Sequence, residues 1–273
     1  MRILFCGDIV GKAGRTIVNQ NLPDLRKKYQ LDVVVINAEN ASHGFGLTPK
    51  AFRDFKTAGA DIITLGNHSF DKQEVSSLLE DTTNEVIRPL NYPENTVGSG
   101  FVIHTLPSGE RLAVINLLGQ VFMHSIESPF VCMDNWLQTY QKGRDFDALL
   151  VDFHAEATAE KRAMGSFLAG KATLVVGTHT HIPTADAMII QNQTGYITDV
   201  GMCGDYDSII GMQVQTALPR FLQGRENAPR LEPAEVSGTF CGVLVESDSL
   251  GNAKKIRPLI FGTHLIEQIP TDF

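Results

Sequence analysis

The sequence predicts an α/β fold in which two β-sheets pack face to face. In the first 80 residues, short apolar runs alternate with segments of helical periodicity, as in parallel β–α–β units. In the later half, residues 187–199 and 240–263 instead have the pattern of antiparallel hairpins. A sandwich of two sheets accommodates both halves. We expect the chain to form one domain, residues 1–273.

The predicted strands are short apolar runs, most of them rich in β-branched residues. Continuous runs of this length are typical of strands that are buried on both faces. The first run ends at an acidic residue, so we interpret it as a strand and not as a signal peptide. The predicted strands cover residues 2–7, 32–36, 61–65, 112–117, 148–153, 172–176, 187–191, 196–199 and 240–246.

Two helices are predicted between the early strands. The first spans residues 13–29, where Pro23 is expected to break or restart it. The second spans residues 48–58 and opens with Thr48 as N-cap and Pro49 at the first helical position.

Two further helices are predicted by the same reasoning, at residues 71–80 and 158–168. In the second of these, Thr158 is a suitable N-cap. Lys161 and Arg162 are expected on its outer face.

Residues 120–134 and 201–235 fit no regular element and are predicted to be loops. Loops of this length in a compact domain are usually functional or flexible. We therefore expect subunit contacts or a lid in these two segments.

The composition excludes several classes of protein. The formal net charge of −8 disfavours duplex DNA or long RNA as the main partner, although a small anionic ligand is possible because a bound metal can reverse the local charge. No apolar run approaches the roughly 18 residues of a membrane span. The cysteines show no CxxC spacing and are interpreted as reduced and mostly structural, as in the cytoplasm; they are Cys6, Cys132, Cys203 and Cys241.

Five of the predicted strands end in side chains that can bind a metal. If these positions were only polar loop residues, we would also expect Lys, Ser and Gln among them. Instead, each strand end has an oxygen or imidazole donor. Ligands of open α/β sheets bind at the carboxyl ends of the strands. The candidate donors are Asp8, Glu39, Asn40, Asn67, His154, His179 and His181.

The number of donors indicates two ions. One zinc-like ion takes about four protein ligands, so seven donors are too many for one site, whereas two ions that share a bridging carboxylate use about four each. Imidazole with carboxylate or amide oxygen suits Fe, Mn or Zn. Two such ions can hold a hydroxide between them and clamp a phosphoryl group.

The sequence resembles the calcineurin-like metallophosphoesterases, and within them the YmdB-type branch of bacterial phosphodiesterases. The motifs occur in the expected order over nearly the whole chain. They are GDIVG at 7–11, INAEN at 36–40, HGFGLT at 43–48, GNHSFD at 66–71 and GTHTH at 177–181, with His154 isolated before the last. The resemblance implies an αββα sandwich.

Two positions depart from the wider superfamily. The usual first motif is Asp-x-His, but Val10 stands where the histidine is expected. The usual Gly-Asp of the second motif is replaced by Ala38-Glu39, followed by Asn40. In the YmdB-type branch this Glu bridges the metals and the Asn is an extra ligand, so the departures mark the branch.

The resemblance implies a role for each candidate residue. Asp8, Glu39, Asn40 and His181 surround one ion, and Glu39, Asn67, His154 and His179 surround the other. His68 protonates the leaving oxygen, a role that suits an imidazole whose ordinary pKa lies near neutrality. Residues two apart in an extended segment point to the same side, so we expect one strand end to present His179 and His181 to different ions.

Other interpretations remain open at several of these positions. Asp8 could be a helix N-cap, and Asn67 could be a turn residue. Asp71 is expected to cap its helix, and His43 to be an ordinary loop residue instead of a substrate contact.

Residues away from the motifs carry weaker expectations. The segment 11–15 could offer backbone N–H groups to a phosphate, with Arg15 as a minor candidate. His104, His124 and His264 are expected to be surface or structural residues, although the segment around His124 could overhang the site.

The resemblance implies a phosphodiesterase in which a metal-bridging hydroxide attacks phosphorus in line. The implied substrates are small cyclic nucleotides, with 2′,3′-cyclic nucleoside monophosphates favoured over 3′,5′-cyclic forms. One alternative is a phosphomonoesterase or nucleotidase of the same superfamily, and another is a regulatory protein that keeps its metals for structure only. A homo-oligomer located in the cytoplasm is also expected.

Overall fold

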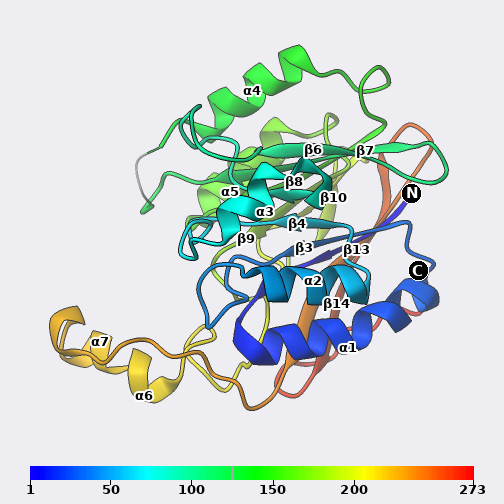
Figure 1. The fold of residues 1–273 in the computed structure, drawn as a ribbon. Coiled ribbons are helices and arrows are strands. Elements are labelled where there is room, and N and C mark those ends of the chain that lie inside the picture. Colours follow the sequence, from blue (N-terminus) through cyan, green and yellow to red (C-terminus); the bar gives the residue numbers. More distant parts are fainter. Residues whose placement is uncertain (124–125) are drawn as a thin grey trace.

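Two six-stranded sheets lie face to face in the computed structural model, which describes residues 1–123 and 126–273 (Figure 1). In the first sheet, β1 (Arg2–Cys6), β3 (Val33–Asn37), β4 (Ile62–Thr64) and β5 (Val86–Ile87) are parallel neighbours. The antiparallel pair β13 (Thr239–Ser247) and β14 (Ala253–Gly262) extends this sheet beyond β1. The predicted hairpin at residues 240–263 is therefore confirmed.

The second sheet has the order β10–β11–β9–β8–β7–β6. Its parallel centre consists of β7 (Arg111–Leu118), β8 (Ala148–His154), β9 (Leu174–Thr178) and β11 (Thr194–Ile197). The antiparallel strands β6 (Phe101–Thr105) and β10 (Met188–Ile190) form its edges. A short parallel pair, β2 (Asp8–Ile9) with β12 (Met202–Cys203), lies beside these sheets.

The alternation of side chains along the strands builds three hydrophobic layers. Ile3 and Phe5 of β1 point into the core between the sheets, together with Val114 of β7. The alternate residue Leu4 packs beneath the helices that cover the first sheet. These layers confirm the predicted αββα sandwich, whereas its assignment to one domain, residues 1–273, stays a prediction.

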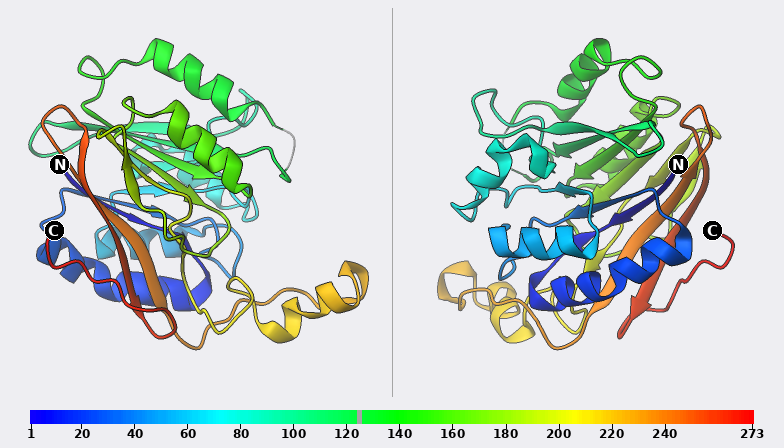
Figure 2. Two further views of the ribbon diagram at one scale, coloured as in Figure 1. Left: turned by 180° about the vertical axis from the view of Figure 1, so that it is seen from behind. Right: turned by 45° about the vertical axis from the view of Figure 1, so that its right-hand side comes forward.

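Helices cover both outer faces (Figure 1). The helices α1 (Gly11–Tyr29), α2 (Pro49–Ala58) and α3 (Val75–Glu80) contribute to the core on the first sheet, and the 3₁₀ turn η1 (Thr82–Asn84) follows α3. The helices α4 (Pro129–Thr139) and α5 (Thr158–Phe167) pack on the second sheet. The short elements α6 (Val214–Ala217), α7 (Pro219–Leu222) and η2 (Arg225–Asn227) form an arm that extends away from the sandwich (Figure 2).

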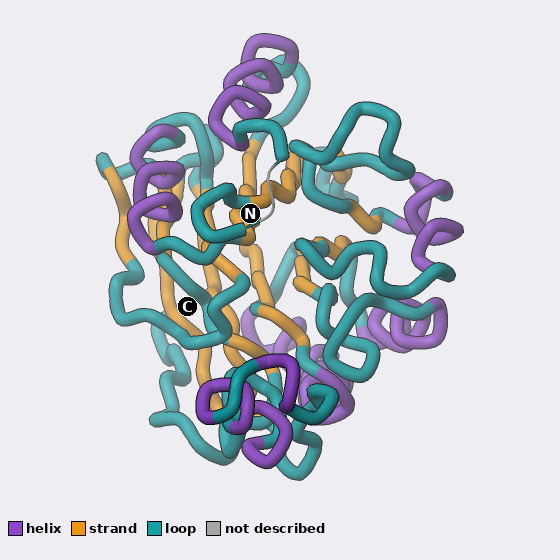
Figure 3. The backbone as a smooth tube through the Cα atoms, turned by 90° about the vertical axis from the view of Figure 1, so that its left-hand side faces the viewer, coloured by secondary structure: helices purple, strands orange, loops and turns teal. Residues whose placement is uncertain are grey.

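Long loops join the ends of the strands on the side of the molecule that faces the viewer in Figure 3. The loops that follow β3, β4 and β9 carry most of the polar motifs of the sequence. The fold therefore gathers motifs that are far apart along the chain.

The predicted helices are present in the structure, but some of their ends differ from the prediction. Thr48 caps α2, since its hydroxyl accepts from the N–H of Ala51, as predicted. Pro23 does not break α1, because buried Leu22 and Leu25 on either side hold the helix against the sheet.

Two further helix predictions are partly wrong. The helix predicted from residue 71 begins only at Val75, after a series of turns. Thr158 is the first residue of α5, so Ala157 occupies the cap position instead. Lys161 is buried, whereas Arg162 is exposed as expected.

The two predicted loops contain regular elements. Helix α4 begins within residues 120–134, where Ser128-Pro129 is a helix-start signal that the prediction missed. The elements β12, α6 and α7 lie within residues 201–235 and are too short to produce a visible periodicity. His124 lies outside the described residues.

The four cysteines are free thiols, as predicted. No helix in the described parts of the chain is long and apolar enough to cross a membrane.

His104 is a structural residue, as expected, and its contact links two elements. Its Nδ1 lies 2.6 Å from Oε1 of Glu85, the residue that precedes β5. The hydrogen bond with Glu85 raises the pKa of His104 above its ordinary value of 6.5. The protonated imidazole therefore stabilises the junction of β6 with the loop before β5.

The contribution of this pair should depend on pH. Because the pKa of His104 is raised in the folded state, the stabilisation is complete below about 6.5 and is lost as the pH rises through the folded-state pKa. We expect His104→Gln to lower the free energy of unfolding by about 1 kcal/mol near pH 5.5 and by much less near pH 9. Urea unfolding at the two pH values measures the loss in free energy. Glu85→Gln should show a similar dependence on pH. An equal loss at both pH values would contradict the pairing.

Candidate metal centre

The sandwich brings the carboxyl ends of strands from both sheets to one place. Asp8 follows β1, Glu39 and Asn40 follow β3, and Asn67 follows β4. The second sheet contributes the last residue of β8 and the two histidines that follow β9. Five of these candidates are buried side chains, namely Asp8, Glu39, Asn40, His154 and His181.

One group of donors converges on the imidazole of His154. Its Nε2 lies 2.9 Å from Oε1 of Glu39, 3.0 Å from Oδ1 of Asn67 and 3.1 Å from Nδ1 of His179. Glu39, His154 and His179 also form the one cluster of potential metal ligands found in the described residues. Ligand atoms that share an ion at bonds of about 2.1 Å lie roughly 3 Å apart, so this group fits a bound metal.

The other nitrogen of His154 sets the tautomer of the ring. Nδ1 lies 2.9 Å from the hydroxyl of Thr178, and that hydroxyl donates to Oδ1 of Asp152 at 2.7 Å. The hydroxyl therefore accepts from Nδ1–H, and the lone pair of Nε2 remains for a cation. Asp152 also accepts from Thr64 and Asn37, so the first ligand shell has a buried support behind it.

The electrostatics of this group also favour a positive charge at its centre. Burial lowers the pKa of His154, but the carboxylates of Glu39, Asp8 and Asp152 together outweigh it and raise the pKa to about 9. Burial raises the pKa of Glu39, but His154 and His68 together bring it down to about 2. Burial and the neighbouring His154 lower the pKa of His179 to about 3. The negative charge around His154 therefore suits a bound cation.

A second group is formed by Asp8, Asn40 and His181. Oδ1 of Asp8 and Oδ1 of Asn40 are buried and have no hydrogen-bond partner in the described structure. Nδ2 of Asn40 donates to the carbonyl of Gly44 at 2.9 Å, which identifies the oxygen as the free end. Buried oxygens without partners are costly, and a cation would satisfy both. The donor set therefore fits a second ion.

The side chain of His181 is also oriented so that it can bind the second ion. Its Nδ1 donates to the carbonyl of Ile210 at 2.8 Å, and its Nε2 lies 3.9 Å from Oδ1 of Asp8. The carbonyl contact fixes the tautomer that leaves Nε2 unprotonated.

The backbone of the GTHTH segment differs from the extended conformation that we expected. Strand β9 ends at Thr178, and His179 and His181 have left-handed φ values of 90° and 65°. The N–H of His179 donates to Oδ2 of Asp8, and the N–H of Thr180 donates to Oδ2 of Asp199. Strained backbone of this kind persists where surrounding contacts enforce it, as at functional sites. The prediction of an extended segment was therefore wrong.

Gly66 allows the ligands to approach one another. A Cβ atom at this position would lie 2.4 Å from Oε2 of Glu39 and 2.6 Å from Nε2 of His154. Any side chain here would enter the centre. The glycine before Asn67 in the GNHSFD motif is therefore a geometric requirement.

His68 lies beside the donors. Its backbone N–H donates to Oε2 of Glu39 at 2.9 Å, and its ring packs edge-on against Phe45 with centroids 5.0 Å apart. Nδ1 lies 2.8 Å from Oδ2 of Asp71. The prediction that Asp71 caps its helix was wrong, since Glu74 occupies the cap position of α3 and Asp71 orients His68 instead.

Two weaker alternatives are also wrong. Asp8 is not a helix N-cap, because Val10 occupies that position before α1. The backbone N–H groups of Gly11 and Lys12 donate to Asn40 and Glu235, and Arg15 donates to the carbonyl of residue 41. These groups are engaged within the protein, so they are not free to bind a phosphate.

The residues that support the centre were not among the candidates predicted from the sequence. Oε2 of Glu156 lies 3.1 Å from Nε2 of His179, and Nζ of Lys161 lies 2.8 Å from Oδ2 of Asp199. Lys161 also donates to the hydroxyl of Thr180, so this buried pair holds the GTHTH backbone from behind. The signal for Asp199 was an acid at the end of a buried strand, but nothing in the helical pattern marked Lys161 as buried.

Removing Lys161 tests this support. In Lys161→Met, Asp199 is left buried without its partner, and we expect a loss of about 3–5 kcal/mol in the free energy of unfolding. The neighbouring Arg162 is exposed and lies over the ring of Tyr196, so Arg162→Met should lower stability by only about 0.5–1 kcal/mol. Urea denaturation of the two variants measures the difference. Equal effects would show that the buried pair does not support the loop.

Comparison with known proteins agrees with this architecture. A 2′,3′-cyclic-nucleotide 2′-phosphodiesterase of Bacillus subtilis (strain 168) is 44% identical over 268 residues, which cover 97% of this chain and 99% of that protein. The crystal structure of a hypothetical protein from Thermus thermophilus aligns with a TM-score of 0.89 at 41% identity, over 96% of this chain and 99% of that one. A Mycoplasma pneumoniae phosphatase aligns with a TM-score of 0.88 at 34% identity, over 99% and 95%.

The sequence model of the YmdB-like protein family matches residues 4–259, which is nearly the whole chain. The resemblance carried by the motifs is thereby confirmed. The chain belongs to the YmdB-like family of the metallophosphoesterase superfamily.

Proposed function

We propose that this protein is a metal-dependent phosphodiesterase that opens 2′,3′-cyclic nucleoside monophosphates. The observation that carries the proposal is a hydrogen-bonded His68–Asp71 pair beside converging metal-type donors. A purely structural metal site has no use for a non-ligand imidazole held in this way. The substrate class is that named for the Bacillus subtilis relative.

We propose the same ligand sets that the motifs imply. Asp8, Glu39, Asn40 and His181 would hold one ion, and Glu39, Asn67, His154 and His179 would hold the other. The short contacts around His154 and the unpartnered oxygens of Asp8 and Asn40 support these two sets. The ions, when bound, would supply a nucleophile at neutral pH and neutralise charge on the phosphoryl oxygens.

The protein's own residues would control the proton. Asp71 accepts from Nδ1–H of His68, so Nε2 is the nitrogen that can give a proton to the departing ribose oxygen. Glu39 and Phe45 hold the residue from two other sides. Opening the ring at the 2′ oxygen consumes one water and leaves a nucleoside 3′-phosphate.

A substrate panel tests the proposal against other activities of the superfamily. The panel contains 2′,3′-cyclic and 3′,5′-cyclic nucleotides, simple diesters and simple monoesters. We expect the 2′,3′-cyclic nucleotides to have the highest kcat/KM. Comparable phosphate release from monoesters would favour a phosphomonoesterase or nucleotidase, and no turnover by metal-loaded protein would favour a regulatory protein.

His68→Ala should separate catalysis from metal binding. Because His68 contributes a backbone N–H, not a ligand atom, we expect this variant to keep its full metal content. Its kcat should fall by about 10²–10⁴-fold, the range of general acid catalysis. Elemental analysis and turnover measurements on the same sample decide the matter. Full activity would show that another group donates the proton.

Glu39→Gln should weaken metal binding itself. The substitution removes the negative charge that both proposed sites share, so we expect at least one ion to be lost per chain. Elemental analysis of variant and wild-type protein measures this, with Glu94→Gln as a control at an exposed position away from every proposed ligand. Two ions per chain in Glu39→Gln would contradict the bridging role.

We further propose Fe or Mn as the ions, with Zn as a third candidate, and a homo-oligomer in the cytoplasm. The mixed nitrogen and oxygen donors support these metals, and the free thiols suit a reducing compartment.

The projecting arm carries Phe221 and Leu222, which are 78% and 72% exposed and are available to a second copy. Elemental analysis after purification without added metal and the mass in solution test these statements. A mass equal to one chain would contradict the oligomer.

A further inference from the structure

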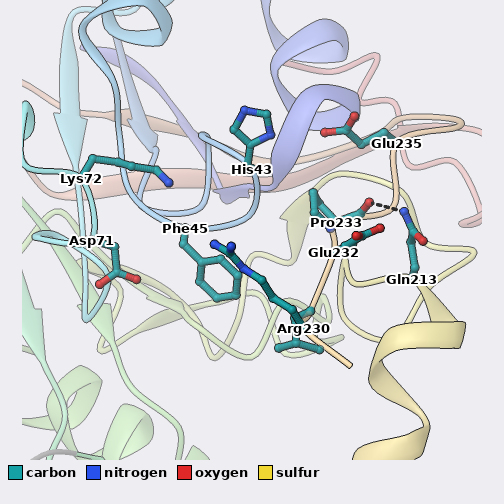
Figure 4. A pocket seen from close by; sticks show the side chains of 10 residues that line it. His43, Phe45, Asp71, Lys72, Gln213, Arg230, Glu232, Pro233 and Glu235 are labelled. Atoms are coloured by element: carbon teal, nitrogen blue, oxygen red, sulfur yellow. Dashed lines mark hydrogen bonds between the residues drawn. The ribbon is translucent and has the colours of Figure 1, made fainter. Parts of the chain in front are cut away.

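A cavity of about 630 Å³ lies beside His68 and plays no part in the chemistry proposed so far (Figure 4). We call it the side pocket. Its walls come from the loop at residues 43–45, from Asp71 and Lys72, and from residues 230–235 at the base of the arm. Its volume lies within the range of cavities that bind small organic ligands.

The side pocket is continuous with the proposed catalytic residues. Phe45 lines the pocket and also packs against the ring of His68. Asp71 lines it and accepts the hydrogen bond from His68. A molecule whose reacting bond lies at His68 therefore has the side pocket as the adjoining space.

The walls of the side pocket are held by hydrogen bonds to backbone groups. On one side, the N–H of Gly46 donates to the carbonyl of Glu39, and Asn40 holds the carbonyl of Gly44. His43, Gly44 and Gly46 have left-handed φ values of 56°, 83° and 78°, which turn this loop into the wall.

The opposite wall is held in the same manner. Gln213 donates through its side chain to the carbonyl of Pro233, and its N–H donates to the carbonyl of Glu232 (Figure 4). The side chain of Glu235 accepts from the N–H of Lys12 at the start of α1. Both walls are therefore built before a ligand arrives.

The lining suits a ligand that is polar but carries little charge. Lys72 and Arg230 point into the cavity from opposite sides (Figure 4) and form no ion pair within the described residues. Asp71, Glu232 and Glu235 offset their charge, so a second phosphate group gains little there. The ring of Phe45 provides an aromatic face, and nucleobases combine a flat ring with donors and acceptors along the edge.

We propose that the side pocket binds the nucleoside part of the substrate, with the base against Phe45 and with Arg230 at the edge of the base. This inference rests on the proposed phosphodiesterase function, because that function places the cyclic phosphate at His68. His43 then lies at the wall of a binding site, which favours the substrate-contact interpretation over that of an ordinary loop residue.

Two substrates that differ only in the base test the inference. One is adenosine 2′,3′-cyclic phosphate, and the other is the 2′,3′-cyclic phosphate of methyl riboside, which has the same reacting bond and no base. Because stacking of a base on an aromatic side chain contributes about 1–3 kcal/mol, we expect the metal-loaded wild-type enzyme to prefer the nucleotide by about 5-fold or more in kcat/KM.

Arg230→Ala should reduce this preference, mainly by raising KM for the nucleotide. Arg225→Ala is the matched control, because Arg225 is exposed on the same arm and does not line the side pocket. A wild-type preference near one, or an unchanged preference in Arg230→Ala, would overturn the nucleoside assignment while leaving the phosphodiesterase activity established.

Binding measurements distinguish the side pocket assignment from the proposed function if neither substrate is hydrolysed. Calorimetric titration with adenosine 3′-phosphate and with methyl riboside 3-phosphate measures the contribution of the base without catalysis. Tighter binding of the nucleotide that is weakened in Arg230→Ala supports the side pocket even if neither cyclic substrate is hydrolysed, an outcome that would overturn only the proposed function. Equal affinities for the two compounds would overturn the side pocket assignment.

Discussion

The buried carboxylate of Glu39 is the interaction on which the rest of the site depends. It lies 2.9 Å from Nε2 of His154, and it accepts the backbone N–H of His68. A buried carboxylate is costly unless positive charge and hydrogen-bond donors surround it. The two sheets must therefore bring an imidazole from β8 to a carboxylate that follows β3, which sets how their strand ends face each other. The short contacts of Asn67 and His179 follow from the same convergence.

The sequence was sufficient to predict what depends on period and on position. Apolar runs such as residues 148–153 identified the central strands, and each strand then identified the polar residue at its carboxyl end. Thr48-Pro49 gave the start of α2 because a cap and a proline act locally. The candidate residues for the centre emerged from the same reasoning, since parallel strands place their ends at one edge.

What the sequence could not provide depends on contacts between distant segments. Lys161 has the pattern of a surface residue, and only the acid at position 199 makes its burial possible. Asp71 follows the rule for a helix cap, but its carboxylate binds the imidazole of His68 instead. The left-handed backbone at His179 and His181 is unfavourable locally and is imposed by Asp8 and Asp199. In each case a tertiary partner overrides the local preference.

The short segment from Glu39 to Gly46 has a consequence for how members of such a family can diverge. It carries two proposed metal ligands and one wall of the side pocket, and hydrogen bonds to the carbonyls of Glu39 and Gly44 join them. An exchange of residues in this wall would disturb the chemistry together with the choice of substrate. Residues 230–235, which form the other wall, contain no proposed metal ligand. New substrate preferences can therefore arise at the base of the arm while the reacting centre is inherited unchanged.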